Sequence, residues 1–264
     1  MTDFDSILPA SLKVLIYFDI FRYPLTIEEI KKMIPYAEEE GLNSDIQEHI
    51  KEKIIFKKGN LYGLTDEKKY FDLRRQGNDR ASKYERKALK RAKFISKFPF
   101  VRGVFISGSF SKGHMLPDGD IDFFILTKNN RMWLCRTILI LYKKAFLFNS
   151  RKFFCLNYFK GEDELIIEEQ NIFTATEIFT LLPVINKELY NKLMEANKWV
   201  ENYYDINKLK PNSAFPLKKR GVQNFIEKLF HNKLGDNLDK YFMKITLRRW
   251  KRKFGNMSQE DFSI

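Results

Sequence analysis

The sequence predicts an α+β protein in which a small sheet is preceded and followed by helical regions. Three patterns predict it: helices and a hairpin in residues 1–65, strands alternating with helices in residues 99–170, and helical periodicity in residues 171–264. The length of 264 residues is long for one compact core and suits two small ones. With 44% hydrophobic and 31% charged residues, the composition is typical of a folded protein and not of a disordered one.

Residues 1–65 have the element order of a winged helix. Helical spacing covers residues 8–21, Thr26 with Glu29 predicts a capping box that opens a second helix, and a third helix is expected over about 44–51. Two short β-type runs then flank the turn signal within 54–63. The third helix has little positive charge, so we expect this winged-helix-like unit to be a structural or protein-interaction module and not a DNA reader.

Residues 66–98 are rich in Lys, Arg and Glu and predict a long, solvated linker helix that ends before Pro99. The region that follows, 99–170, predicts a small sheet because apolar, β-branched runs alternate with a helical stretch. Its expected elements are strands at 101–108, 121–127 and 152–159, a helix at 131–148 and a short fourth strand at 164–167.

Residues 171–264 predict helices and hold most of the positive charge. Pro183 is expected to kink or split a helix, and two prolines in 207–216 predict a linker. Residues 207–264 contain 14 Lys and Arg against 5 Asp and Glu, whereas the whole chain has a net charge of +13. The basic amphipathic stretch 236–254 is compatible with nucleic acid or a membrane surface, but we expect its apolar stripe to pack on its own domain.

Several classes of protein are disfavoured. Cys135 and Cys155 form no C-x-x-C pair and the three histidines are scattered, so neither a disulfide framework nor a structural zinc site is expected. The N-terminal residues lack the pattern of a signal peptide, and charges interrupt the apolar stretch 132–148. We therefore expect a cytoplasmic protein without a transmembrane segment.

The candidate functional residues are concentrated in the segment GSFSKGHMLPDGDIDFFIL, residues 108–126. A strand ends at Gly108-Ser109, where a glycine lets backbone amides approach phosphate oxygens and the serine adds a hydroxyl donor. Asp120 and Asp122 then introduce an apolar strand, and residues i and i+2 of a strand point to the same face.

Two ionised carboxylates side by side repel unless a cation lies between them. Mg²⁺ binds carboxylate and phosphate oxygens together, and such ions stabilise the attacking and leaving oxygens of a phosphoryl displacement. Asp120 and Asp122 are therefore the predicted metal ligands and catalytic residues. Asp118 is expected to serve the turn Pro117-Asp118-Gly119 instead.

This segment resembles the motif of the DNA polymerase beta-like nucleotidyltransferase superfamily. The matching positions are Gly108, Ser109, Gly113, Asp120 and Asp122, with Lys112 where a basic residue usually stands. The resemblance covers about residues 99–160 and implies a polymerase-beta-like core with Mg²⁺ as cofactor. It further implies nucleotide binding by Gly108, Ser109 and Lys112. The order of the whole chain also resembles bacterial proteins described only as nucleotidyltransferase-domain proteins.

The chain departs from the superfamily pattern in one respect. A third carboxylate normally stands on the strand after the intervening helix, where this sequence offers Asn157. The alternatives nearby are Glu162, Asp163, Glu164, Glu168 and Glu169.

The resemblance implies transfer of a nucleoside monophosphate from a nucleoside triphosphate, such as ATP, to an acceptor hydroxyl. The sequence selects neither the base nor the acceptor. The alternatives are a catalytically weak nucleotide sensor or DNA-binding regulator, and one partner of a toxin–antitoxin pair. Possible partners beyond the nucleotide are nucleic acid, through the basic C-terminal region, and another protein.

Overall fold

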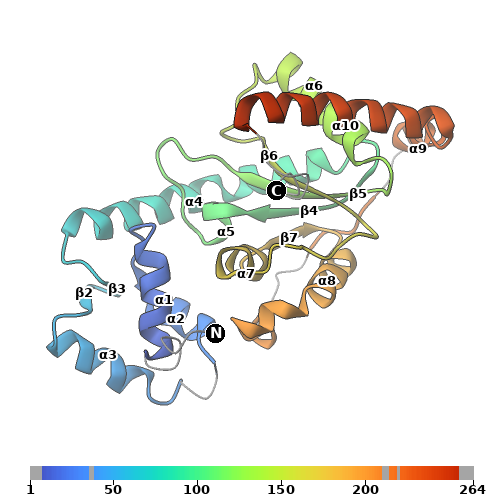
Figure 1. Ribbon diagram of the computed structural model, residues 1–264. Helices are drawn as coiled ribbons and strands as arrows, with labels where there is room; N and C mark the ends of the chain where they lie inside the picture. Colours follow the sequence, from blue (N-terminus) through green and yellow to red (C-terminus); the bar gives the residue numbers. More distant parts are fainter. Residues whose placement is uncertain (1–7, 36–38, 210–213, 219–220, 256–264) are drawn as a thin grey trace. The chain divides into compact units, whose positions relative to one another are not determined.

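The computed structural model describes residues 8–35, 39–209, 214–218 and 221–255 (Figure 1). The chain divides into two compact units, one formed by residues 1–80 with 199–210 and the other by 81–198 with 211–264. Each unit is described by itself. Helix α4 (Lys68–Ile95) contributes its first half to the first unit and its second half to the second.

The first unit combines three helices with a small antiparallel sheet. Its elements are α1 (Ala10–Asp19), β1 (Leu25–Thr26), α2 (Ile27–Met33), α3 (Leu42–Lys51), β2 (Phe56–Lys58) and β3 (Leu61–Gly63). The strand order is β1-β3-β2. The predicted capping box is confirmed, since Thr26 accepts from the Glu29 amide and Glu29 accepts from the Thr26 amide. Arg74 of α4 is buried and pairs with Glu29 at 2.5 Å, which holds the start of α4 against this unit. Two short 3₁₀ helices, η3 (Lys198–Asn202) and η4 (Ile206–Lys208), follow much later in the chain.

The second unit is built on a four-stranded mixed sheet. Its strands are β4 (Val101–Ser107), β5 (Asp122–Thr127), β6 (Cys155–Gly161) and β7 (Leu182–Ile185), in the order β6-β5-β4-β7. β4 runs antiparallel to both β5 and β7, whereas β5 and β6 are parallel. The parallel pair requires a crossover, which helix α6 (Met132–Phe146) supplies. The predicted α+β class is confirmed, and the sheet is mixed.

One face of this sheet is covered by α6 and the second half of α4. Alternate strand residues such as Val104, Ile106, Phe123 and Ile125 are fully buried there, in one cluster with side chains of both helices. Strand residues alternate between the two faces, so Phe105, Ser107, Asp122 and Phe124 lie on the other face. The polar residues of the motif are thus presented on the face away from α4 and α6.

The second face is covered by shorter helices. They are α7 (Ile172–Phe179) and α8 (Lys187–Ala196), and Tyr190 of α8 packs edge-on against Phe105 with ring centroids 5.5 Å apart. The four-residue helix α5 (Gly108–Ser111) follows β4 directly. Because α7 covers the second face, it lies on the same face as the motif residues.

The C-terminal helices α9 (Gly221–Leu229) and α10 (Lys233–Phe254) belong to the second unit, and α10 runs along α6 (Figure 1). Asp239 accepts from the Leu134 amide at 2.8 Å, and the rings of Trp133 and Trp250 meet edge to face. Phe242 packs against the core cluster. The apolar stripe of α10 therefore packs in part on its own domain, as expected.

Two predicted elements are wrong. Residues 164–167 form no strand, and the fourth strand is β7, within the segment that the sequence analysis assigned to a helix split at Pro183. Pro183 stands beside an irregularity in the pairing of β7 with β4, on a strand at the end of the sheet, and proline is tolerated at such positions.

Candidate active site

The turn after β4 brings the backbone close to the aspartates. Gly108 has φ +66°, a left-handed conformation that favours glycine, and a Cβ at this position would collide with Oδ2 of Asp122. The predicted contact between the Gly108 turn and the Asp-x-Asp segment is therefore present in space. Ser109 follows the turn and is exposed.

Asp120, Asp122 and Cys155 form a cluster that is able to bind a metal ion. One possible ligand atom of each lies within 4.8 Å of those of the others, and all three residues are half-buried. The strand register explains the cluster, because Asp122 pairs with Ser107 of β4 on one side and with Cys155 of β6 on the other. β5 begins at Asp122, so Asp120 reaches the cluster from the preceding loop.

The surroundings of Asp122 disfavour its ionised form. Burial raises the pKa of Asp122, the carboxylates of Asp120 and Glu177 raise it further, and Cys155 and Lys112 oppose them. Burial and the hydrogen bond to Asp122 raise the pKa of the Cys155 thiol, which stays protonated. Such a crowded, partly desolvated set of acids is stabilised by a bound cation.

Glu177 of α7 is a third carboxylate near the aspartates, and sequence reasoning missed it. Its Oε2 accepts from the Gly108 amide at 3.0 Å, and its Oε1 pairs with Lys112 Nζ at 2.7 Å. No local pattern marks Glu177, because it reaches the site only when β7 pairs with β4 and returns α7 to this face. An anionic group thus already occupies the Gly108 turn.

The residue expected in place of a third carboxylate on β6 was Asn157, which lines a cavity together with Ser107 and Phe124. Asn157 lies in an irregularity between the pairs Phe123–Leu156 and Phe124–Tyr158, where β6 has one extra residue. Cys155 precedes this irregularity and is the β6 residue that pairs with Asp122.

The acidic alternatives beyond β6 lie at other places. Glu162 and Asp163 follow the far end of β6 and contact Arg102 and Asn129, respectively. Because β5 and β6 are parallel, this end is the one remote from Asp122. Glu164 follows them, whereas Glu168 and Glu169 lie near Tyr158, whose pKa they raise together with burial.

Residues 85–206 match the family model described as "Nucleotidyltransferase domain". The matched span contains the Gly108 turn, the aspartates, Cys155 and Glu177. The chain therefore carries a nucleotidyltransferase domain of the DNA polymerase beta-like superfamily. The predicted superfamily is confirmed, and the domain is that of an enzyme with the Asp120 and Asp122 pair in place. No curated protein and no solved structure shows significant similarity to the chain.

The aspartate pair is compatible with a metal cofactor. Nucleotidyltransferase domains typically use a divalent metal ion, and the two aspartates offer the carboxylate oxygens that such an ion prefers. Among the described residues, none of the helices has the length and apolar character needed to cross a bilayer.

Proposed function

We propose that this chain transfers a nucleoside monophosphate from a nucleoside triphosphate, with Mg²⁺, to an acceptor hydroxyl. The observation that carries the proposal is the juxtaposition of an anion-binding turn with a carboxylate cluster. Glu177 already accepts from the Gly108 amide and from Lys112, beside Asp122. Phosphate oxygens present the same kind of acceptor to these donors.

Each residue has a defined task in this proposal. Asp120 and Asp122 hold Mg²⁺, which supplies charge neutralisation for the phosphates when it is bound. Gly108, Ser109 and Lys112 bind the outer phosphates through an amide, a hydroxyl and an ammonium group. The outer phosphates replace the Glu177 carboxylate on the turn, so nucleotide binding requires Glu177 to rotate away.

A labelled nucleotide distinguishes this reaction from other phosphate chemistry. The four triphosphates ATP, GTP, CTP and UTP, labelled at the α- or the γ-phosphate, are incubated with Mg²⁺ and with small-molecule or protein fractions of a cell extract. We expect α-label on an acceptor, pyrophosphate release, and loss of both in Asp120→Ala. Transfer of the γ-label would instead identify a phosphotransferase and contradict the proposal. Asp163→Asn, at the far end of β6, is the matched control.

A nucleotide sensor is the second candidate function, and Cys155 favours it. A protonated thiol beside Asp122 provides no third negative charge for a metal ion. In a sensor, calorimetry detects Mg²⁺-dependent binding of a nucleotide, but neither label is transferred to any fraction.

We interpret the first unit as winged-helix-like, since three helices precede and flank a three-stranded antiparallel sheet. Its proposed role is an interaction module for an enzyme that works in the cytoplasm. We also propose that the basic residues of α10 bind nucleic acid.

A further inference from the structure

A cavity of about 240 Å³ opens beside the candidate active site, within the second unit. It lies on the sheet face that carries Asp122, between β4, β5, β6 and α7. Three aromatic residues, Phe124, Tyr158 and Phe173, contribute to its lining. Its volume is below the roughly 300–1,000 Å³ of sites for drug-sized ligands, so it accommodates a small molecule or one ring system.

Two of the lining rings, Phe124 and Tyr158, belong to a row of stacked rings. Phe124 stacks on Tyr158 with ring centroids 4.5 Å apart and on Phe105 at 6.0 Å. The register places this row two residues along β4 and β5, and three along β6, from the row of Ser107, Asp122 and Cys155. A ligand lying on the rings is therefore next to the metal-binding aspartates.

Two hydroxyl groups of the lining have no partner within the described residues. Ser107 Oγ and Tyr158 Oη are both buried without a hydrogen bond, and Ser107 is only 4% exposed. Buried polar atoms without a partner are uncommon and call for an explanation such as a ligand. Ser107 Oγ turns about a single bond, so a polar group entering the cavity can reach it.

The charged groups of the lining are acidic. Glu169 contributes to it, as does Glu177, which is paired with Lys112, and Glu168 is close enough to raise the pKa of Tyr158. None of the cavity-lining residues described by the structure is a lysine or arginine. Carboxylates and aromatic faces together attract a cation, whereas they repel a phosphate.

The in-line geometry of the proposed reaction indicates which substrate binds in the cavity. Pyrophosphate leaves toward the Gly108 turn, at the end of β4, because that turn binds the outer phosphates. The nucleophile of an in-line displacement approaches from the opposite side. Across the sheet that side is β6. The cavity extends from the turn, where Ser107 and Glu177 line it, to β6, which supplies Asn157 and Tyr158.

We propose that this cavity binds the acceptor, and that the acceptor is a small, positively charged molecule with a flat ring and a free hydroxyl. This inference rests on the proposed function. The ring lies against Tyr158 and Phe173, the cationic group faces Glu169, and the hydroxyl points toward Asp122. The hydroxyl oxygen forms a bond to the α-phosphorus of the triphosphate, the bond to the bridging oxygen breaks, and pyrophosphate leaves. The hydroxyl proton passes to water.

Three probes of one shape test the charge preference. Tyramine carries an ammonium group, 4-ethylphenol carries none, and 3-(4-hydroxyphenyl)propionate carries a carboxylate. Calorimetric titration of the full chain without nucleotide is expected to give tyramine about tenfold tighter binding than 4-ethylphenol. The propionate is expected to show no binding. Glu169→Gln removes most of the difference between the first two, and Phe173→Ala weakens both.

Asp163→Asn is the control variant, because Asp163 lies at the far end of β6 and should leave all three affinities unchanged. Failure of every probe to bind, equal binding of all three, or tightest binding of the propionate would each overturn the inference. Competition by adenosine or cytidine for the bound probe would also overturn it, because it would assign the cavity to the base of the nucleotide. Since no triphosphate is present, these results are independent of whether the chain transfers nucleotides.

Discussion

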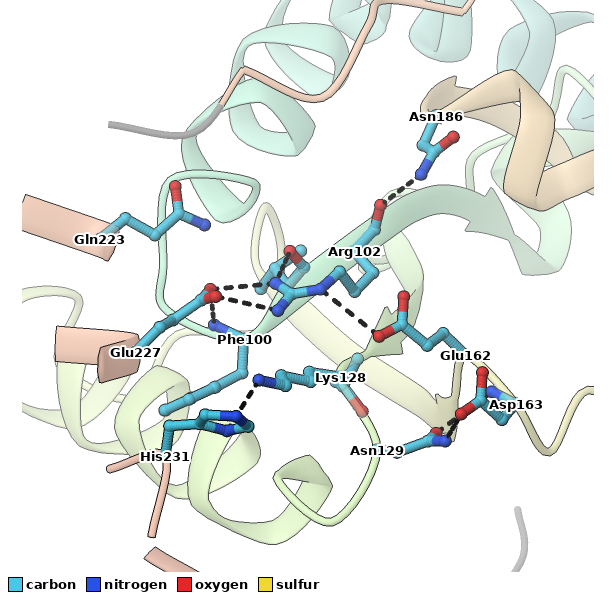
Figure 2. A network of polar contacts seen from close by, with 12 residues as sticks. Phe100, Arg102, Lys128, Asn129, Glu162, Asp163, Asn186, Gln223, Glu227 and His231 are labelled. Carbon is cyan, nitrogen blue, oxygen red and sulfur yellow. Dashed lines mark hydrogen bonds and ion pairs between the residues drawn. The ribbon is translucent and has the colours of Figure 1, made fainter. Parts of the chain in front are cut away.

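Acidic side chains have opposite surroundings at the two ends of the four-stranded sheet. At one end, Asp120, Asp122 and Glu177 gather around a glycine turn, and Lys112 is the cation among the groups that act on Asp122. At the other end, Arg102 is buried and donates two hydrogen bonds of 2.9 Å to Glu227 of α9 (Figure 2). Arg102 also lies 3.5 Å from Glu162.

This difference separates acids that hold the fold from acids that are available for chemistry. Glu227 further accepts from the Phe100 amide, so its charge is satisfied from three donors (Figure 2). Asp122 instead has its pKa raised by burial and by neighbouring carboxylates. A paired acid stabilises structure, whereas a crowded one is stabilised by a ligand cation. The same sheet therefore has a structural end and a candidate catalytic end.

Removing a carboxylate at the catalytic end gives the largest expected effect. Asp122→Asn is expected to lower the rate of pyrophosphate release about 1,000-fold, because metal coordination contributes several kcal/mol to such reactions. Asp163→Asn, at the structural end, is expected to change the rate less than about twofold. Rates that fall equally in both variants would remove the distinction between the two ends.

Breaking the paired charges at the structural end is expected to affect stability and not catalysis. Arg102→Met leaves Glu227 buried without its main partner and is expected to reduce the free energy of unfolding by about 3 kcal/mol. Urea denaturation measures the loss. The double variant Arg102→Met/Glu227→Met is expected to recover part of it, since it removes the buried unpaired carboxylate but leaves the Phe100 amide without its acceptor. A double variant as unstable as the single one would show that the ion pair is not the cause.

Substitutions of Cys155 test whether the metal ion lies beside β6. Cys155→Asp adds a carboxylate on β6 beside Asp122, so Mg²⁺ affinity is expected to rise about tenfold in a calorimetric titration. Without metal the melting temperature is expected to fall, because another acid joins the crowded cluster. Cys155→Ser, which adds no charge, serves as the control. Unchanged Mg²⁺ affinity in Cys155→Asp would place the metal away from β6.

Glu177 gives the smallest expected effect. Glu177→Gln weakens the contact with Lys112, so an entering triphosphate displaces it more easily and KM is expected to fall about threefold. Steady-state kinetics of pyrophosphate release measures KM and kcat separately. A large fall in kcat with unchanged KM would instead show that Glu177 takes part in the chemical step.

The sequence predicted the local part of the site, because Gly108, Asp120 and Asp122 belong to one strand–turn–strand segment with fixed spacing. It also predicted β4, β5 and α6 closely. It failed where position depends on remote pairing: β7 joins the sheet at an edge, and this alone brings Glu177 to the turn. β6 has one extra residue at Asn157, and side-chain alternation cannot reveal such an irregularity in advance.

The most direct test of the central claim is calorimetric titration of the four triphosphates with and without Mg²⁺. It compares the wild-type chain with Asp120→Ala and Asp163→Asn. We predict that at least one triphosphate binds in the presence of Mg²⁺, that Asp120→Ala abolishes this binding, and that Asp163→Asn preserves it. Absence of Mg²⁺-dependent binding for all four triphosphates, or equal binding by Asp120→Ala, would contradict the assignment of the aspartate end of the sheet as the nucleotide site.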